Sequence, residues 1–173
     1  MDLICLKVEA RFPGQGVSLS SDSPLPLQCD SHHEDTFILK VKGLTVSTRS
    51  GGEAGGCQVE MHLTLGEDPG PRLAGFAAAQ EVPLTPTSPL PPELTLPLTL
   101  AACHLPGERR FIFSENAVLT AARTPAGDFR LTVTGDFKSR TIPCQETDLI
   151  LHLARPEAAK LLSYWLSAVQ ELR

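Results

Sequence analysis

The residues with the most obvious chemistry lie between positions 29 and 35, where the chain reads Cys-Asp-Ser-His-His-Glu-Asp. Thiolate, imidazole and carboxylate groups are the ligands that zinc prefers, so Cys29, His32 and His33 are candidate metal ligands. The segment lacks a second Cys or His pair at a fixed spacing, and adjacent histidines point in different directions on most backbones. A solvated polar loop is therefore the favoured interpretation, and we expect no cofactor.

A second pair of reactive residues, Cys103 and His104, has the side chains needed for a nucleophile and its base. Neighbours on a chain seldom meet in the geometry that this chemistry requires. The chain also lacks the Gly-x-Ser-x-Gly, Gly-x-x-x-x-Gly-Lys and His-Glu-x-x-His patterns of known catalytic and nucleotide-binding sites. We therefore expect that the protein is not an enzyme. An enzyme whose site assembles from distant strands is the alternative.

Basic residues are the candidates for binding an anionic ligand. They are Lys40, Lys42, Arg49, Arg109, Arg110, Lys138 and Arg140. Acidic residues surround the first three, and the whole chain carries a net charge of -5, which disfavours nucleic acid as a partner. Exposed basic side chains that serve solubility are the default interpretation. Binding to phosphoinositides or another membrane surface is kept as an alternative function.

The cysteines and the first residues indicate the compartment. Five scattered cysteines, an odd number without a Cys-x-x-Cys pair, are not typical of a secreted disulfide framework. Charged residues at positions 2, 7 and 9 break the pattern of a secretory signal. No apolar run approaches the roughly 20 residues that cross a bilayer, so we expect no transmembrane segment. A cytoplasmic or nuclear location is the resulting prediction.

The clearest single element is an amphipathic helix over residues 156–172. Pro156 suits the first turn, where its missing N–H would have no helical partner. Apolar residues then recur every three to four positions, as they do on one helical face. They are Ala158, Leu161, Leu162, Trp165, Ala168, Val169 and Leu172. We expect this helix to lie across an open sheet.

Most of the remaining chain alternates between apolar and polar residues, which is typical of half-buried strands. Residues 57–66 alternate most regularly, and with residues 36–49 they are predicted to form a β-hairpin. A change of phase at Gly43 suggests a bulge. Residues 73–82 are ambiguous, because their alanines favour a helix while Phe76 and Val82 tolerate a strand.

The predicted fold is mainly β: antiparallel sheets form a partly open barrel or sandwich, capped by one C-terminal α-helix. A chain of 173 residues suits a single domain over residues 1–173. Residues 83–97 hold six of the prolines and are predicted to be an extended loop. The predicted core consists of Val59, Met61, Leu63, Leu131, Val133, Leu149, Leu151, Leu161, Leu162, Trp165 and Val169.

The end of the chain resembles a pleckstrin-homology domain. That family closes with a strand, a short turn and a helix whose tryptophan is followed by an aliphatic-x-Ala-aliphatic pattern, and residues 165–170, Trp-Leu-Ser-Ala-Val-Gln, are similar to it. The residues 110–119 are similar to a central strand pair. The resemblance covers roughly the last third of the chain and implies two near-orthogonal sheets. The chain is longer than that module, so its proline-rich and glycine-rich segments would be insertions.

The favoured function is a non-catalytic protein-interaction module, a subunit or terminal domain of a larger assembly. An uncovered sheet edge offers backbone groups to a partner's strand. The candidate partner-binding residues in the proline-rich segment are Leu84, Leu90, Leu94 and Leu96. They suit docking to another protein or self-association into a homo-oligomer. The alternative for these leucines is that the segment folds back and fills a groove of its own sheet.

Overall fold

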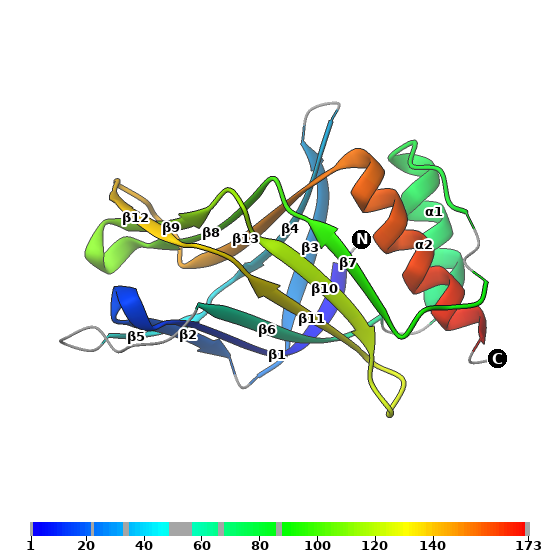
Figure 1. The fold of residues 1–173 in the computed structure, drawn as a ribbon, viewed down its shortest axis with the longest axis horizontal. Coiled ribbons are helices and arrows are strands. Elements are labelled where there is room, and N and C mark those ends of the chain that lie inside the picture. The colour runs from blue at the N-terminus through cyan, green and yellow to red at the C-terminus, as the bar shows by residue number, and fades with distance from the viewer. Residues whose placement is uncertain are drawn as a thin grey trace.

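The computed structural model describes residues 2–21, 23–32, 35–48, 57–65, 68–85 and 88–171. Its helices are α1 (Pro69–Ala79) and α2 (Arg155–Glu171), with short 3-10 turns η1 (Pro13–Gln15) and η2 (Pro106–Glu108) (Figure 1). Its strands are β1 (Asp2–Phe12), β2 (Val17–Ser21), β3 (Leu25–His32), β4 (Thr36–Lys42), β5 (Thr45–Thr48), β6 (Gln58–Thr64), β7 (Glu93–Pro97), β8 (Leu100–Leu105), β9 (Arg110–Ser114), β10 (Val118–Arg123), β11 (Phe129–Thr134), β12 (Lys138–Thr141) and β13 (Asp148–Ala154).

The fold is mainly β, and its described strands form one antiparallel sheet of 13 strands that does not close. The order across the sheet is β12-β9-β8-β13-β4-β3-β1-β6-β11-β10-β7. β2 pairs with β1 and carries β5 as a branch. The main path therefore ends at β12 on one side and at β7 on the other, and the branch ends at β5.

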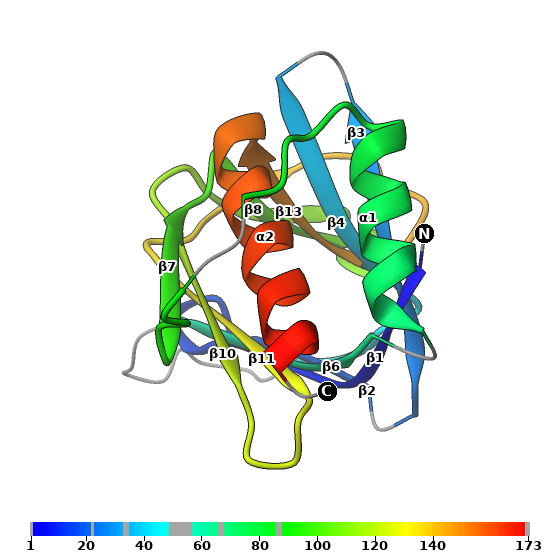
Figure 2. The same ribbon diagram turned by 90° about the vertical axis from the view of Figure 1, so that its right-hand side faces the viewer.

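The first strand is the point where the sheet bends. β1 pairs with β6 along most of its length, with β3 through its first residues and with β2 through its last residues. Its register with β6 shifts between Cys5 and Lys7, as at a β-bulge, which increases local twist. The curled sheet then forms two layers, and α1 and α2 lie side by side across one end of them (Figures 1 and 2).

The core lies on the inner face of this curled sheet and under α2. Every residue of the core predicted above is buried, so this prediction is confirmed. Trp165 is fully buried, and its ring lies 6.2 Å from the ring of Phe129. The predicted C-terminal helix is also confirmed. It is α2, which begins at Arg155, one residue before the predicted start. It contacts β4, β7, β13 and α1.

The prediction of only one helix is wrong, because α1 is a second helix. Pro69 stands at its first turn, where a missing N–H costs no helical hydrogen bond. Leu73, Phe76 and Ala77 are buried at helical spacing, and α1 packs against α2. The Phe76 ring also meets that of Phe37 on β4 at 5.7 Å. Burial against these partners resolves the ambiguity that local propensity left in this segment.

The predicted hairpin between residues 36–49 and 57–66 is also wrong. β4 pairs with β3 and β13, whereas β6 pairs with β1 and β11. β4 ends at Lys42, and Gly43 adopts a φ of 80°, a left-handed conformation that glycine tolerates. The chain then enters β5, which pairs with β2. The change of phase at Gly43, which was predicted to be a bulge, is therefore the place where the chain changes its partner strand.

The proline-rich segment is partly a strand. Its last five residues form β7, which pairs with β10 and ends the sheet. Pro97 stands in this end strand, a position where the lack of an N–H is tolerated. The Tyr164 hydroxyl on α2 donates a hydrogen bond to the carbonyl of Pro92 (3.3 Å), which ties the start of this strand to the helix.

The burial of Trp165 predicts a large effect of its removal. Trp165→Ala is expected to lower the free energy of unfolding by about 3–5 kcal/mol, because the substitution leaves a cavity between α2 and β11. Urea denaturation measures this difference. Gln170→Ala, at an exposed position of the same helix, is the control and is expected to change stability by less than about 0.5 kcal/mol. Equal stability of the two variants would contradict the central place given to α2.

Candidate interaction surface

A group of interacting polar and aromatic side chains lies on the outer face of β4, β13, β8, β9 and β12. Cross-strand register places five residues in one row, one from each strand: Lys42, Asp148, His104, Phe111 and Arg140. We call this set the outer row. Residues directly opposite one another in a sheet point to the same face, so these side chains share one surface.

A carboxylate with little solvent exposure stands near the middle of the outer row. The Asp148 side chain is only 5% exposed, and its Oδ1 lies 2.6 Å from Nδ1 of His104. The backbone N–H of His104 also donates to Oδ1, at 3.3 Å. On the other side, Lys40 Nζ lies 3.7 Å from Oδ2. A buried charge requires such partners, so Asp148 fastens β4 and β8 to β13.

An aspartate that orients a histidine is also a component of catalytic triads, which need a nucleophile beyond the histidine. The neighbouring Cys103 does not supply it, because consecutive residues of β8 point to opposite faces and Cys103 is buried in the core. This contradicts the nucleophile–base pair considered from sequence. Instead, the His104 ring lies against the Phe111 ring, with centroids 4.8 Å apart.

The two lysines of β4 are neutralised by acidic residues. Lys42 Nζ lies 3.4 Å from Glu146, and Lys40 Nζ lies 3.8 Å from the same carboxylate in addition to its contact with Asp148. These lysines therefore do not form the positive pocket considered from sequence. Arg49, the third residue of that set, lies outside the described residues.

Aromatic rings continue the outer row toward the end of the sheet. Phe111 and Phe113 stack with centroids 5.3 Å apart and an interplanar angle of 12°. The guanidinium of Arg140 lies 5.0 Å from the centre of the Phe113 ring. Such cation–π contact restricts the arginine while leaving its N–H donors free to bind an acid.

Among the described strands, none pairs with the outer edge of the end strand β12. All four of its residues are exposed, and β9 is its neighbour in the sheet. The Ile142 N–H donates to the carbonyl of Arg109 (2.9 Å), which continues the β12–β9 register by one pair. Hydrogen-bonded pairs alternate in antiparallel sheets. The backbone groups of Ser139 and Thr141 therefore point away from β9.

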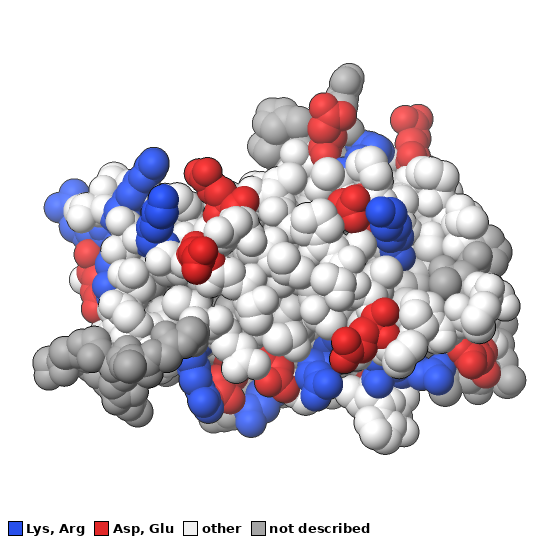
Figure 3. Space-filling model, in the orientation of Figure 1, with Lys and Arg blue, Asp and Glu red and all other residues white. Residues whose placement is uncertain are grey.

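The structure brings some of the predicted basic residues together at this edge. Arg109, Lys138 and Arg140 are exposed, and Figure 3 shows basic side chains gathered over β12 and the adjoining turn. None of the three forms an ion pair within the described ranges. Arg110 differs, because it is paired with Glu108 (2.5 Å) and donates to the carbonyl of Gln15 (2.9 Å). It therefore connects η2 to η1.

The leucines predicted to bind a partner are buried or partly buried in this structure. Leu96 is 1% exposed and belongs to the core, which contradicts its presentation to a partner. Leu84, Leu90 and Leu94 are partly buried and pack against the same core. Register explains this result for β7: Leu94 and Leu96 lie opposite Ala121 and Leu119, whose side chains point inward.

The candidate metal ligands do not form a described site. Cys29 is buried in the core on β3, and its Sγ lies 3.9 Å from the carbonyl of Leu27. His33 lies outside the described residues, as does the side chain of His32. Elsewhere in the described ranges, no group of three or more His, Cys, Asp or Glu residues has the arrangement needed to hold a metal ion.

Three of the cysteines, Cys5, Cys57 and Cys103, are poorly suited to nucleophilic chemistry. Burial raises the pKa of the Cys5 thiol to about 11, although a backbone hydrogen bond with Lys7 opposes the shift. Burial also raises the pKa of Cys103, with a smaller contribution from the charge of Asp148. The pKa of Cys57 is raised by burial as well. A thiol must ionise to act as a nucleophile, so these three are held in the unreactive form.

The partners of Asp148 predict that its charge stabilises the fold. Asp148→Asn is expected to lower the free energy of unfolding by about 1–3 kcal/mol, because Lys40 and His104 lose a charged acceptor. Chemical denaturation tests this expectation. Glu146→Gln, which removes a carboxylate that is half exposed, serves as the control and is expected to cost less than about 1 kcal/mol. A loss no larger than that of the control would contradict the role given to Asp148.

The raised thiol pKa values predict lower stability in alkali. Unfolded thiols ionise near pH 8.5, whereas the Cys5 thiol stays protonated until about pH 11 when folded. The stabilisation is complete below the unfolded pKa and is lost as pH rises through the folded pKa, by up to about 1.4 kcal/mol per pH unit for each such thiol. Denaturation at pH 8 and about pH 10 measures the slope. Cys103→Ala is expected to reduce it, and an unchanged slope would contradict the burial described.

Comparison with known proteins adds no family to these observations. Among the helices of the described residues, none combines the length and apolar character needed to span a membrane. No protein-family model, no curated protein and no solved structure matches the chain.

Proposed function

We propose that this protein is a non-catalytic module that binds another protein by adding the partner's strand to its sheet. The observation that carries the proposal is β12, the end strand of an open sheet, with all four residues exposed. Ser139 and Thr141 direct their backbone groups outward from this edge, where an extended chain can pair with them. The partner would gain main-chain hydrogen bonds without a rearrangement of the core.

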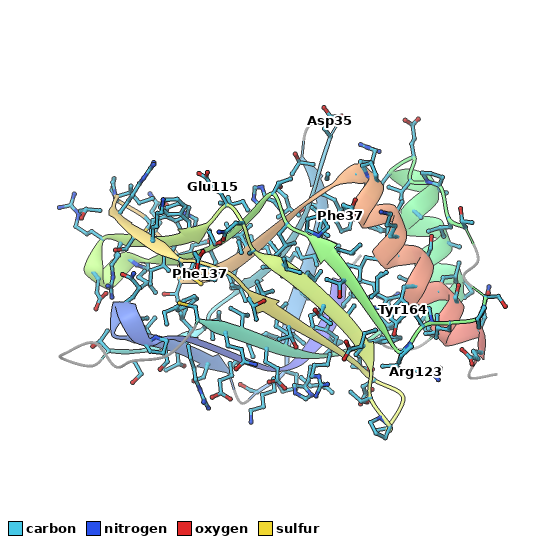
Figure 4. The ribbon with its side chains drawn as sticks, in the orientation of Figure 1. Asp35, Phe37, Glu115, Arg123, Phe137 and Tyr164 are labelled. Atoms are coloured by element: carbon cyan, nitrogen blue, oxygen red, sulfur yellow. The ribbon has the colours of Figure 1, made fainter. Side chains whose placement is uncertain are left out.

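The opposite end of the sheet is less suited to strand addition. β7 contains Pro97, which has no N–H to offer a partner. Leu96 is buried in the core, Leu94 is partly buried against it, and Tyr164 of α2 donates a hydrogen bond to Pro92, the residue before β7 (Figure 4). These features favour β12 over β7 as the edge that receives a partner, in place of the leucines of the proline-rich segment.

The outer row supports a binding role in preference to catalysis. His104 is held between Asp148 and the ring of Phe111, so its contacts fix the sheet surface. The buried thiols are kept protonated. The five cysteines form no disulfide with one another, which is consistent with a reducing compartment and supports a cytoplasmic or nuclear location for the assembly that contains this protein.

The pleckstrin-homology resemblance stays a proposal about the end of the chain. Its support is that α2 follows directly from β13 and lies across one end of a curled antiparallel sheet (Figure 2). In that interpretation, several of the 13 strands and α1 would be additions to the module. The function proposed here rests on β12 and not on this resemblance.

Binding to an anionic membrane surface is a second candidate, favoured by one observation. Arg109, Lys138 and Arg140 are exposed at one end and carry no ion pair in the described part of the chain. Each basic residue near such a surface contributes about 1 kcal/mol. Lys40 and Lys42 are already paired with acidic residues, which weakens this candidate relative to strand addition.

Proline substitution in β12 tests strand addition. Tagged full-length protein is purified from its native cells, and the recovered partners are identified by mass spectrometry for wild type, Ser139→Pro and Ser139→Ala. We expect Ser139→Pro to lose the partner, because it removes an outward N–H while leaving the β9 ladder intact. Ser139→Ala is the matched control and should retain it.

Thermal denaturation accompanies this experiment and should give similar melting temperatures for both variants. Partner recovery that is unaffected by Ser139→Pro would contradict binding at this edge. Recovery of the wild-type protein alone at its native concentration would contradict the interaction function itself.

A further inference from the structure

The end strand β12 carries a pattern of charge that bears on what it binds. Lys138 and Arg140 are two residues apart, so both point to the outer face, while Ser139 between them points to the inner face. Arg140 is held over Phe113, which confirms its side of the sheet. The edge therefore presents two cationic side chains at the two-residue spacing of a strand. Next to them, the backbone N–H and C=O groups of Ser139 and Thr141 point away from β9.

Lys138 and Arg140 lack the acidic partners that several other basic residues in the described ranges have. Lys42 contacts Glu146, Lys160 contacts Glu157, and Arg123 contacts Glu171. Within the described ranges, Lys138 and Arg140 form no ion pair, although the chain has 20 acidic and 15 basic residues. Asp136 is the nearest acid along the chain, and it accepts a hydrogen bond from Asn116 (3.1 Å). An acidic side chain of a partner protein would complete this surface.

Charge also selects between a second copy of this chain and a different partner. Two β12 strands paired edge to edge would place Lys138 and Arg140 of both copies along the same short ladder. Like charges facing each other across strands are destabilising, and edge lysines commonly protect sheets against such pairing. The same charges favour a strand whose side chains on the outer face are acidic.

Resting on the proposed function of strand addition, we infer that β12 binds an extended acidic segment with carboxylates at alternate positions, acid-x-acid. The two acids pair with Lys138 and Arg140 on the outer face. The intervening residue lies opposite Ser139 on the inner face. Phe137 comes before β12 on that inner side, and its ring contacts that of Phe12 at 4.9 Å (Figure 4). A small or apolar residue suits this middle position.

Fluorescence anisotropy with defined peptides tests the inference. The probe is a labelled peptide of alternating Glu and Thr, and the control is a peptide of the same composition with all glutamates in one block. We expect saturable binding of the alternating peptide and at least a tenfold weaker affinity for the block peptide. Ser139→Pro and the double variant Lys138→Glu/Arg140→Glu should each weaken binding of the alternating peptide at least tenfold. The double variant should instead bind a peptide of alternating Lys and Thr.

Several outcomes would overturn the inference. They are equal affinity for the alternating and block peptides, no binding of either, or binding that Ser139→Pro does not change. Sedimentation with phosphatidylserine vesicles that depends on Lys138 and Arg140 but not on Ser139 would assign the cations to a membrane instead. If the native partner is lost with Ser139→Pro but retained by the charge-reversal variant, strand addition stands and the acidic motif is wrong. If the partner survives both variants, both proposals fail.

Discussion

The backbone of an antiparallel sheet must find hydrogen-bond partners along every strand, and a sheet that does not close leaves its end strands with unpaired groups. This constraint governs the molecule more than any single side chain does. The curled sheet has three end strands among the described residues: β7 and β12 on its main path, and β5 on its branch. β7 and β12 meet the constraint differently. β7 carries Pro97 and turns Leu96 into the core. β12 is exposed and carries Lys138 and Arg140.

The outer row connects that open end to the rest of the fold. Asp148 holds His104 of β8 and Lys40 of β4, and His104 continues through Phe111 and Phe113 to Arg140. Contacts of this kind reduce the freedom of the side chains at the surface before anything binds. An edge that is held rigid loses less conformational entropy when it acquires a partner. The same contacts hold the His104 ring between Asp148 and Phe111.

Sequence alone predicted the parts of the fold that depend on local periodicity. Alternation identified the inward residues of β6, β11 and β13, and helical spacing identified α2 and the burial of Trp165. Neighbour relations were not predictable in this way. The residues of β4 alternate equally well beside β3 and β13 as beside β6, so the predicted hairpin failed although burial was predicted correctly. The prediction of an extended loop over the leucines of β7 was wrong for a related reason. The prolines suggested a loop, whereas these residues form an end strand that pairs with β10.

The outer row was harder to predict because its contacts join residues far apart in the chain. Asp148 and His104 stand 44 positions from each other, and Lys40 comes from a third strand. The sequence does indicate that each of these three residues lies on the outer face of a strand, because each is a polar residue at an outward position of an alternating pattern. Which of these residues share a row depends on strand order, which alternation does not encode. Lys138 and Arg140 were recognised as candidates from their spacing, but their lack of acidic neighbours required the fold.

Amide hydrogen exchange along β12 tests the central claim that this edge is open, and nuclear magnetic resonance resolves it residue by residue. The register predicts an alternation: slow exchange at Lys138, Arg140 and Ile142, whose N–H groups face β9, and fast exchange at Ser139 and Thr141, whose N–H groups face outward. Protection of Ser139 and Thr141 equal to that of their neighbours would show that the edge is already covered, and would contradict the account.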